Sequence, residues 1–257
     1  MTPPLLEPLF PPGPAATVAE LLARVRPRER AHAARPFTYV NMIATADGRA
    51  ALGGSTAALG DDADLEMLLG LRTLADAVLI GTGTLRAEGY DTLVRAPERR
   101  ARRRACGQDE TPLAVLLSRS FELPWDAGLF AARDQPILVY TGAGAGPDPP
   151  DVAAPVEIVR LADPAPAAVL ADLRARGVDA LLCEGGPTLN RALLEAGVVD
   201  ELFLTLAPLL TGDEVEPAIV AGGRLGVPLS LALRWVLRAG DELFLRYGLA
   251  YDLSPGH

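Results

Sequence analysis

The chain has 257 residues and a mass of 27.0 kDa, and 49% of its residues are apolar, which is enough for the core of one large α/β domain or of two small ones. Its formal net charge of −9 and its pI near 4.8 argue against nucleic acid as the main partner, so any phosphate site has to be built locally. No uninterrupted apolar stretch reaches the roughly 18 to 20 residues that a membrane span needs. We therefore expect a cytoplasmic protein that acts without a membrane.

The chain has two cysteines and two histidines. Cys106 and Cys183 lie far apart and outside any CxxC pattern, so we expect a loop thiol and a small buried side chain rather than a disulfide or a zinc site. His32 lies in a proline-flanked segment and His257 is the last residue, so neither suits a catalytic base. The chemistry of this chain is expected to do without histidine.

Residues 1–35 are rich in proline, and we interpret them as an N-terminal arm with one short helix, followed by a single domain over residues 36–257. Short continuous apolar runs then alternate with helical patterns, which favours a mostly parallel sheet flanked by helices. The expected strands are 37–43, 77–81, 113–118, 136–140, 156–161 and 179–184, and the expected helices are 61–74, 167–177 and 188–197. The arginine-rich stretch at 95–104 is typical of a solvated helix face or loop.

The C-terminal part has a different pattern, because residues 200–208, 231–240 and 241–251 are β-rich with few helical signals. Residues 239–242 read Ala-Gly-Asp-Glu and predict a hairpin turn. The predicted fold class is therefore α/β with an antiparallel C-terminal hairpin on a mostly parallel sheet.

A glycine pair follows the expected strand at 179–184 and precedes the expected helix at 188–197. Backbone N–H groups at a helix start bind anions, and glycine lets a ligand approach the chain. Glu184 is left as a carboxylate at the strand's end, beside a turn that we interpret as a cofactor phosphate site, formed by Gly185, Gly186, Pro187, Thr188 and Leu189.

Two further turns follow strands in the same way. Gly81, Gly83 and Thr84 lie in a GTGT turn that resembles half of a dinucleotide fingerprint, although position 86 is arginine where that fingerprint needs glycine. Asp47 begins an Asp-Gly pair after the first strand of the domain, and such a pair can be a simple turn. Since ligands of open α/β sheets gather at the carboxyl ends of the strands, the turns together predict a nucleotide site.

These motifs in this order resemble the pyrimidine reductase family of riboflavin biosynthesis, the C-terminal half of the bifunctional deaminase-reductase. The resemblance rests on TADGR at 45–49, LR at 71–72, GTGT at 81–84, EGGPTLN at 184–190, the LLEAGVVDEL stretch at 193–202 and APLLTG at 207–212, and it covers residues 35 to about 251. It implies a dihydrofolate-reductase-like fold, NADPH as cofactor without a metal, a homodimer, and reduction of a ribosylamino to a ribitylamino group on a pyrimidine ribose phosphate. The zinc signature of the deaminase half does not occur, so the chain is expected to catalyse at most the reduction.

The resemblance also implies roles for individual residues. Positions that would contact NADPH are Ala44, Thr84, Glu88 and Ser118 together with the glycine turn at 185–189, and Arg119 after the strand at 113–118 is a candidate for the 2′-phosphate. Positions that would hold substrate are Asn41, Thr56, Arg72, Arg95 and Glu184. Asp47 and Glu88 are the candidate catalytic residues, and either Glu88, through a water, or solvent would supply the proton.

One departure from the family pattern affects the substrate. Where the family has Asp-Asp-Pro, this chain has Glu88-Gly89-Tyr90, so the first acid is kept and the second acid and the proline are replaced. Tyr90 could stack on a flat ring or pack in its loop. A dihydrofolate or pterin reductase, and a non-catalytic NADP-binding protein, therefore stay open as alternatives to the pyrimidine reductase.

Overall fold

The computed structural model describes residues 3–144, 146 and 149–251. Its contacts divide the chain into two compact units. The first comprises the residues up to 26, 38–70 and those from 187 on, and the second comprises 27–37 and 71–186. Strand β3 (Phe37–Thr45) and helix α2 (Asp62–Leu74) each contribute residues to both units. The organisation into an arm and a single domain stays a prediction.

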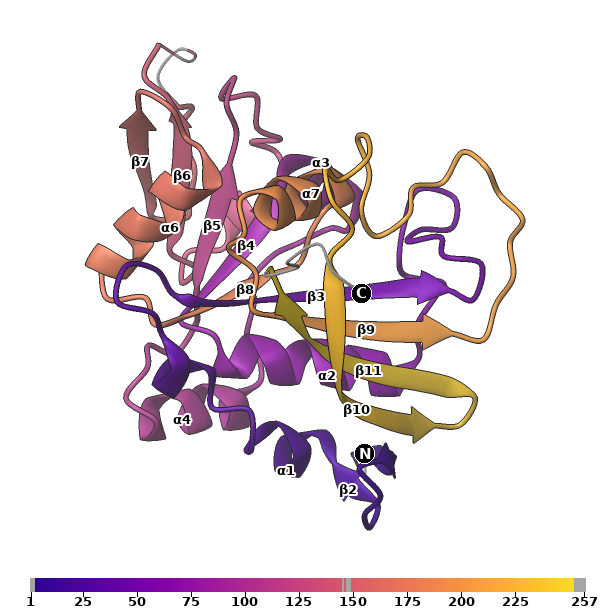
Figure 1. The fold of residues 1–257 in the computed structure, drawn as a ribbon. Helices are drawn as coiled ribbons and strands as arrows, with labels where there is room; N and C mark the ends of the chain where they lie inside the picture. The colour runs from indigo at the N-terminus through magenta and orange to yellow at the C-terminus, as the bar shows by residue number, and fades with distance from the viewer. Residues whose placement is uncertain (1–2, 145, 147–148, 252–257) are drawn as a thin grey trace. The chain divides into compact units, whose positions relative to one another are not determined.

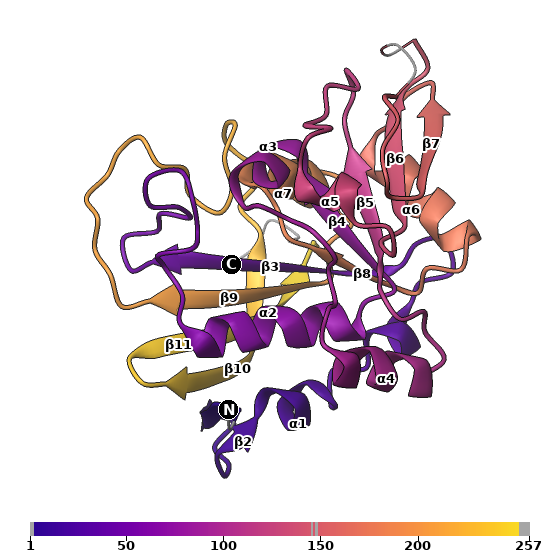
Figure 2. The ribbon, with the colours of Figure 1, turned by 180° about the vertical axis from the view of Figure 1, so that it is seen from behind.

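The second unit contains a parallel sheet with strand order β8-β4-β5-β6-β7. Every residue of β4 and of β8 is buried, as expected for apolar strands covered on both faces. Helix α6 lies in front of this sheet in Figure 1 and α5 lies in front of it in Figure 2, so the two helices cover opposite faces. The strands are β4 (Ala77–Gly81), β5 (Leu113–Leu117), β6 (Ile137–Gly142), β7 (Val156–Leu161) and β8 (Ala180–Cys183), and the helices are α3 (Thr82–Ala87), α4 (Pro97–Ala105), α5 (Gly128–Ala131), α6 (Pro166–Ala175) and the 3-10 turn η1 (Pro27–Arg30).

The first unit contains a mostly antiparallel sheet with strand order β2-β1-β10-β11-β9-β3, in which only the β9–β3 pair is parallel. Burial alternates along β9, and its buried face carries Phe203 in edge-to-face contact with Tyr39 and Trp235, at centroid distances of 5.8 and 5.6 Å. The strands besides β3 are β1 (Leu5–Phe10), β2 (Ala16–Thr17), β9 (Glu201–Ala207), β10 (Ser230–Ala239) and β11 (Glu242–Ala250), and the helices besides α2 are α1 (Val18–Leu22) and α7 (Pro187–Glu195).

The predicted α/β fold class is confirmed, including the antiparallel C-terminal hairpin, whose turn joins Ala239 to Glu242. The N-terminal residues contain the expected short helix, α1, and also the strands β1 and β2, which the sequence analysis does not predict. Pro8 within β1 is the reason, because proline is excluded from central strands. It is tolerated here since β1 pairs with the end of β10 and with the two-residue strand β2 only.

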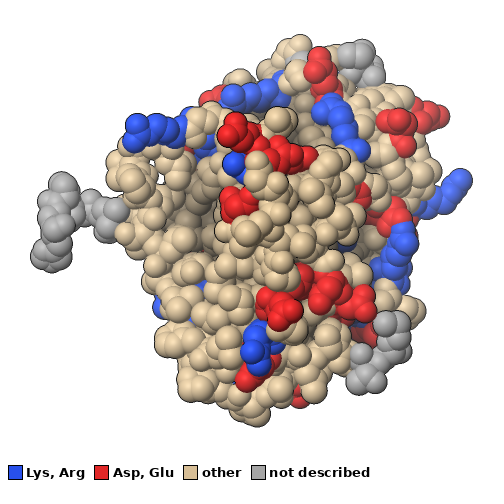
Figure 3. All heavy atoms as spheres, turned by 90° about the vertical axis from the view of Figure 1, so that its right-hand side faces the viewer, with Lys and Arg blue, Asp and Glu red and all other residues tan. Residues whose placement is uncertain are grey.

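Among the described residues, none of the helices combines the length and the apolar character needed to cross a membrane. On the face drawn in Figure 3, the acidic side chains form several groups with basic side chains scattered among them. The described residues on this face therefore form no extended patch of basic side chains, which nucleic acid binding requires.

Three acidic residues meet at the start of α2 and of β11 in the first unit. Glu242 is 4% exposed and accepts a hydrogen bond from the backbone N–H of Asp61 at 3.2 Å. Burial, together with the negative charge of Asp61, raises the pKa of Glu242 to about 8. Burial also raises the pKa of Asp64, against the effect of a hydrogen bond with Thr205. The folded protein therefore holds Glu242 in its protonated form at neutral pH.

This shift predicts a loss of stability in mildly alkaline solution. Because the folded-state pKa of Glu242 lies above the ordinary value of 4.5, its stabilisation is complete below about pH 4.5 and is lost as the pH rises through 8. Between pH 6 and 9 the free energy of unfolding should fall by on the order of 2 kcal/mol, less than the full conversion of about 1.4 kcal/mol per pKa unit because of solvent screening. Glu242→Gln should remove this part of the slope in urea titrations, and Glu214→Gln, at an exposed position, should keep it. Equal slopes for wild type and Glu242→Gln would contradict the assignment.

Candidate functional site

Glu184 directly follows strand β8 and lies at the carboxyl end of the parallel sheet of the second unit. The residue is 7% exposed, and its carboxylate accepts two hydrogen bonds from Arg72, from Nε at 2.6 Å and from Nη2 at 2.7 Å. The hydroxyl of Tyr90 donates a third hydrogen bond, at 2.7 Å. A carboxylate has about four acceptor positions, so the protein itself fills most of those of Glu184.

The electrostatics of this cluster keep the Arg72 guanidinium charged and the Tyr90 hydroxyl protonated. Burial acts to lower the pKa of Arg72, but the carboxylate of Glu184 more than offsets it, and the net shift is upward. Burial first, and Glu184 second, raise the pKa of Tyr90 well above its ordinary value, so its hydroxyl stays protonated and donates. The Arg72 guanidinium also lies 5.3 Å from the centre of the Tyr90 ring. Loop residues 88–93 are thereby fastened to the end of β8, since Arg72 Nη1 reaches the carbonyl of Leu93 as well.

The two glycine turns of the second unit pack directly on each other. The N–H of Gly81, at the end of β4, donates to the carbonyl of Gly185 at 2.6 Å. A Cβ at position 81 would lie 2.6 Å from the backbone nitrogen of Gly186 and 3.0 Å from the carbonyl oxygen of Gly185. Gly185 has a φ of +80°, and the peptide bond between Gly185 and Gly186 is cis. Only glycine at position 81 permits this approach of backbone to backbone.

Thr84 and Glu88 belong to the α3 segment that follows Gly81. A Cβ at Gly186 would lie 2.8 Å from the Thr84 hydroxyl, so this side chain borders the glycine turn. A Cβ at Gly83 would meet nothing within 4 Å, which leaves the backbone there open. Glu88 is the C-cap of α3, half-buried, with its N–H donating to the carbonyl of Thr84 at 3.0 Å.

The first unit contains the start of α7, with Pro187 in its first turn, exposed Thr188 and half-buried Leu189. A segment that comprises residues 208–223 contacts this helix. The side-chain amide of Asn190 donates to the carbonyl of Ile219 at 2.8 Å, Arg191 donates to the carbonyl of Gly222, and the N–H of Ala221 donates to the carbonyl of Pro187 at 3.3 Å.

The same segment, 208–223, is fastened to the Asp-Gly turn after β3. The carboxylate of Asp47 accepts hydrogen bonds from the hydroxyl of Thr45 at 2.5 Å and from the backbone N–H groups of Gly212 at 2.7 Å and Thr211 at 3.2 Å. The Thr45 hydroxyl, followed by these N–H groups, lowers the pKa of Asp47. Asp47 therefore stays ionised and anchors a loop, which makes it a poor proton donor.

The remaining predicted residues are spread over both units. In the first, Asn41 and Thr56 are half-buried and Ala44 is 3% exposed, and the Asn41 Oδ1 atom is buried without a hydrogen-bond partner among the described residues. In the second, Ser118 is buried at the end of β5 and Arg119 is exposed. The Arg95 side chain is 69% exposed and pairs with Asp91, so it does not join the buried cluster at Glu184.

The sequence analysis predicts Arg72 and Glu184 as substrate-binding residues. It does not predict that they bind each other, or that the Tyr90 hydroxyl donates a hydrogen bond to Glu184. The available signal was Tyr90 itself, which stands three residues before Leu93 where the family resemblance leads us to expect proline. A tyrosine hydroxyl that is buried needs a hydrogen-bond partner, and a carboxylate at a strand end offers one.

Comparisons with known proteins show the family and the fold of this chain. Residues 36–244 match the family described as the RibD C-terminal domain. The chain is 25% identical over 191 residues to the 2,5-diamino-6-ribosylamino-4(3H)-pyrimidinone 5′-phosphate reductase of Archaeoglobus fulgidus, which covers 73% of this chain and 87% of that protein. Identity to the reductase of the same name from Methanothermobacter thermautotrophicus is 24% over 224 residues, 83% of this chain and 98% of that protein.

Among solved structures, a pyrimidine reductase-like protein from Corynebacterium diphtheriae superposes with a TM-score of 0.75 at 24% identity, over 92% of this chain and 100% of that chain. The riboflavin biosynthesis reductase Rib7 of Saccharomyces cerevisiae superposes with a TM-score of 0.65 at 16% identity, over 91% and 99% of the two chains. These two likenesses establish the fold. With the match over residues 36–244, the chain belongs to the RibD C-terminal domain family of riboflavin-pathway pyrimidine reductases.

Proposed function

We propose that this chain is an NADPH-dependent reductase that acts on a 5-amino-6-(5-phosphoribosylamino)uracil-type substrate. The observation that carries the proposal is the match of residues 36–244 to the reductase family. The resemblance of the motifs supports it, because it assigns Arg72, Glu184 and the glycine turn to the site. In such a reaction a hydride adds to the carbon of a C=N group, a proton adds to the nitrogen, and the nicotinamide is oxidised.

The residues present fit a nucleotide cofactor. In the second unit, the Gly81–Gly185 contact leaves a glycine turn without side chains, and the backbone at Gly83 is open. In the first unit, α7 has first-turn N–H groups of a kind that suits a phosphate. Ser118 and exposed Arg119 follow β5 and are our candidates for the 2′-phosphate, which would favour NADPH over NADH. NADPH, when bound, supplies the hydride.

The proton needs a donor of this chain or water. All 24 basic residues are arginines, which stay protonated at any working pH, and Asp47 is held ionised by Thr45 and Gly212. Tyr90 is fully engaged with Glu184. Glu88, half-buried at the end of α3, or a water molecule that it positions, is therefore the donor that we favour.

Two kinds of group would recognise the substrate: the buried carboxylate of Glu184, which the protein holds in place, and the exposed guanidinium of Arg95. The hydrogen bonds that Arg72 and Tyr90 donate to Glu184 leave this carboxylate about one acceptor position for a ring N–H or amino group. Arg95 is exposed, whereas Arg72 is buried against Glu184, so Arg95 is the better candidate for binding the substrate phosphate. On binding, the phosphate would replace Asp91 as the partner of Arg95.

The decisive experiment is NADPH oxidation, followed at 340 nm, with the ribosylaminopyrimidine 5′-phosphate and with dihydrofolate as separate substrates. We expect turnover of the pyrimidine. The variant Arg95→Ala should raise the Michaelis constant for the pyrimidine tenfold or more, since a charge-assisted hydrogen bond contributes about 1.5 to 3 kcal/mol. Turnover of dihydrofolate alone would favour the alternative that the protein is a pterin reductase. NADPH binding without turnover of either substrate would indicate a non-catalytic NADP-binding protein.

The glycine contact generates a second prediction. In Gly81→Ala the new Cβ meets backbone atoms of Gly185 and Gly186, so the turn has to shift, at a cost of about 1 to 3 kcal/mol of stability and with weaker NADPH binding. Gly144→Ala is the matched control, because a Cβ there meets nothing within 4 Å. Thermal melts with and without NADPH measure both effects. Wild-type NADPH affinity in a folded Gly81→Ala protein would refute the role of this turn in cofactor binding.

We propose in addition that the chain forms a homodimer. In the first unit, the half-buried residues of β9 and their cross-strand partners on β11 lie on one sheet face, and exposed apolar residues of β10 continue it. A sheet face formed by a contiguous set of partly exposed apolar side chains is typical of interaction surfaces. Its members are Leu202, Leu204, Leu206, Leu243, Leu245, Tyr247, Leu231 and Leu233.

The dimer prediction is tested by sedimentation velocity at micromolar concentration, where a species of twice 27.0 kDa is expected. Leu233→Arg places a charge on the proposed face, at a side chain that is already 40% exposed, and should weaken association at least tenfold. Leu65→Arg is the control, since Leu65 is 52% exposed on α2. A wild-type protein that sediments as a monomer, or equal effects of the two variants, would remove this claim.

A further inference from the structure

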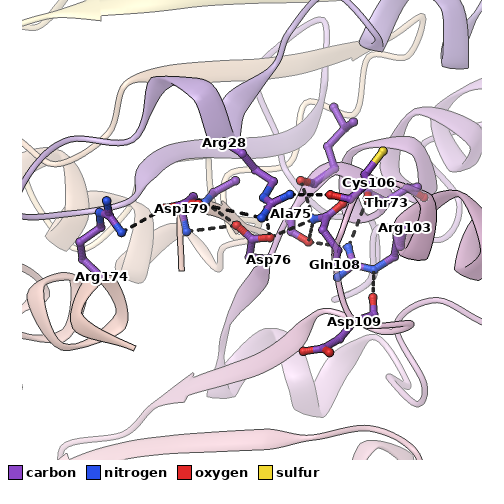
Figure 4. A network of polar contacts seen from close by, with 12 residues as sticks. Arg28, Thr73, Ala75, Asp76, Arg103, Cys106, Gln108, Asp109, Arg174 and Asp179 are labelled. Carbon is purple, nitrogen blue, oxygen red and sulfur yellow. Dashed lines mark hydrogen bonds and ion pairs between the residues drawn. The ribbon is translucent and has the colours of Figure 1, made fainter. Parts of the chain in front are cut away.

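The arginine-rich stretch contains one arginine that is not part of a solvated face. Arg103 on α4 is 1% exposed, whereas Arg102 and Arg104 beside it are exposed. Its Nε donates to the carbonyl of Asp109 at 2.8 Å, and its Nη1 reaches the backbone carbonyls of Arg72 at 3.1 Å, Thr73 at 3.2 Å and Ala75. Figure 4 shows this guanidinium directed at the end of α2.

These acceptors are the carbonyl groups that the end of a helix leaves without partners. The last carbonyls of an α-helix have no intrahelical donor, and the helix dipole makes them attractive to a cation. Arg103 satisfies those of Arg72 and Thr73, and the Gln108 side-chain amide satisfies those of Leu74 at 3.2 Å and Ala75 at 3.1 Å. The end of α2 is therefore capped by a buried charge and an amide from the α4 segment.

The same end of α2 is joined to the beginning of β8. Gln108 also donates to Asp76 Oδ1 at 3.0 Å, and Asp76 Oδ2 accepts from the backbone N–H groups of Asp179 at 3.1 Å and Ala180 at 3.0 Å. Arg28 completes the network through an ion pair with Asp76 at 3.1 Å and a hydrogen bond to the carbonyl of Cys106 at 2.8 Å (Figure 4).

The other end of β8 carries Glu184, which binds the side chain of Arg72 from the capped turn. The chain at the end of α2 therefore binds both ends of β8. Asp76, which follows the helix, binds the start of β8, and Arg72 in the last helical turn binds Glu184 at the finish of β8. A displacement of that turn would move the Arg72 guanidinium relative to Glu184, and with it the hydroxyl of Tyr90.

We propose that Arg103 is a positioning residue, which sets the last turn of α2 so that Arg72 holds Glu184 and Tyr90 in place beside the glycine turn at 185–186. Arg103 touches no reacting group in this account, and it acts through the backbone of Arg72. The effect on catalysis rests on the proposed function, whereas the effect on the Arg72, Glu184 and Tyr90 cluster does not.

The test compares Arg103→Met with Arg102→Met, which removes the same charge from an exposed position on the same helix. The protein is labelled with [ζ-13C]tyrosine, which gives five signals, and Tyr90→Phe identifies the one from Tyr90. The carbon next to the hydroxyl reports the hydrogen bond to Glu184 without substrate or cofactor. Steady-state kinetics with NADPH and the pyrimidine phosphate are measured on the same variants.

We expect Arg103→Met to shift the Tyr90 signal and to lower kcat/KM at least tenfold in protein that remains folded, and Arg103→Lys, which keeps the cation, to recover part of both. Arg102→Met should leave both unchanged. A lower melting temperature with an unchanged Tyr90 signal and unchanged kcat/KM would make Arg103 a stabilising cap only, and would overturn the proposal.

If Arg103→Met does not fold, Gln108→Leu removes the second cap and should shift the Tyr90 signal in the same direction, and an unchanged signal there would also overturn the proposal. If the wild type turns over neither substrate, the proposed function fails, and the Tyr90 signal alone decides the part played by Arg103.

Discussion

The second unit is organised around one buried ion pair, between Arg72 and Glu184. Both side chains are largely removed from water, at 13% and 4% exposure, and such a pair offsets its desolvation only with good geometry and with its remaining hydrogen bonds satisfied. The structure meets both conditions, because the contact is bidentate, Tyr90 donates to the carboxylate and Leu93 accepts from the guanidinium. The pair therefore joins the last turn of α2 to the end of strand β8 and to loop 88–93.

A site built in this way separates the residues that shape it from those that react. In the second unit, the Tyr90 hydroxyl and most acceptor positions of Glu184 are satisfied by the protein itself, so these side chains define a surface and the position of loop 88–93. The groups that we propose for ligands are backbone atoms of the glycine turns and exposed side chains such as Arg95 and Arg119. Preorganisation of this kind is what a hydride transfer needs, since the protein chiefly has to hold two reactants in the right geometry.

Much of the fold could be predicted from sequence because its strongest signals are local. The continuous apolar runs of β4 and β5, the helical period of α2 and the turn between Ala239 and Glu242 each specify their element without reference to the rest of the chain. Strand β1 was missed because Pro8 has the opposite local preference, and its pairing with β10 joins residues more than 200 positions apart.

For the candidate site, the order of motifs predicts Arg72, Glu184 and the glycine turn as members, and their contact with a ligand stays a prediction. A sequence does not say whether a carboxylate faces a ligand or an arginine of the same chain. Arg103 illustrates the limit best. The sequence around Arg103 contains several arginines, and nothing in it indicates which of them is buried. Arg103 is recognised only from the structure, where it binds the carbonyl groups at the end of α2.

The central claim is that the Arg72–Glu184 pair organises the site for NADPH-dependent reduction, and the double variant Arg72→Met/Glu184→Met tests it most directly. Either single variant leaves a buried charge without its partner and should lose about 3 to 5 kcal/mol of stability, whereas the double variant, with apolar groups of similar volume, should regain most of it. Urea unfolding and NADPH oxidation with the pyrimidine phosphate are measured on all four proteins. The account predicts a double variant that is folded and stable but far slower than wild type. A stable double variant with wild-type kcat and KM would contradict it.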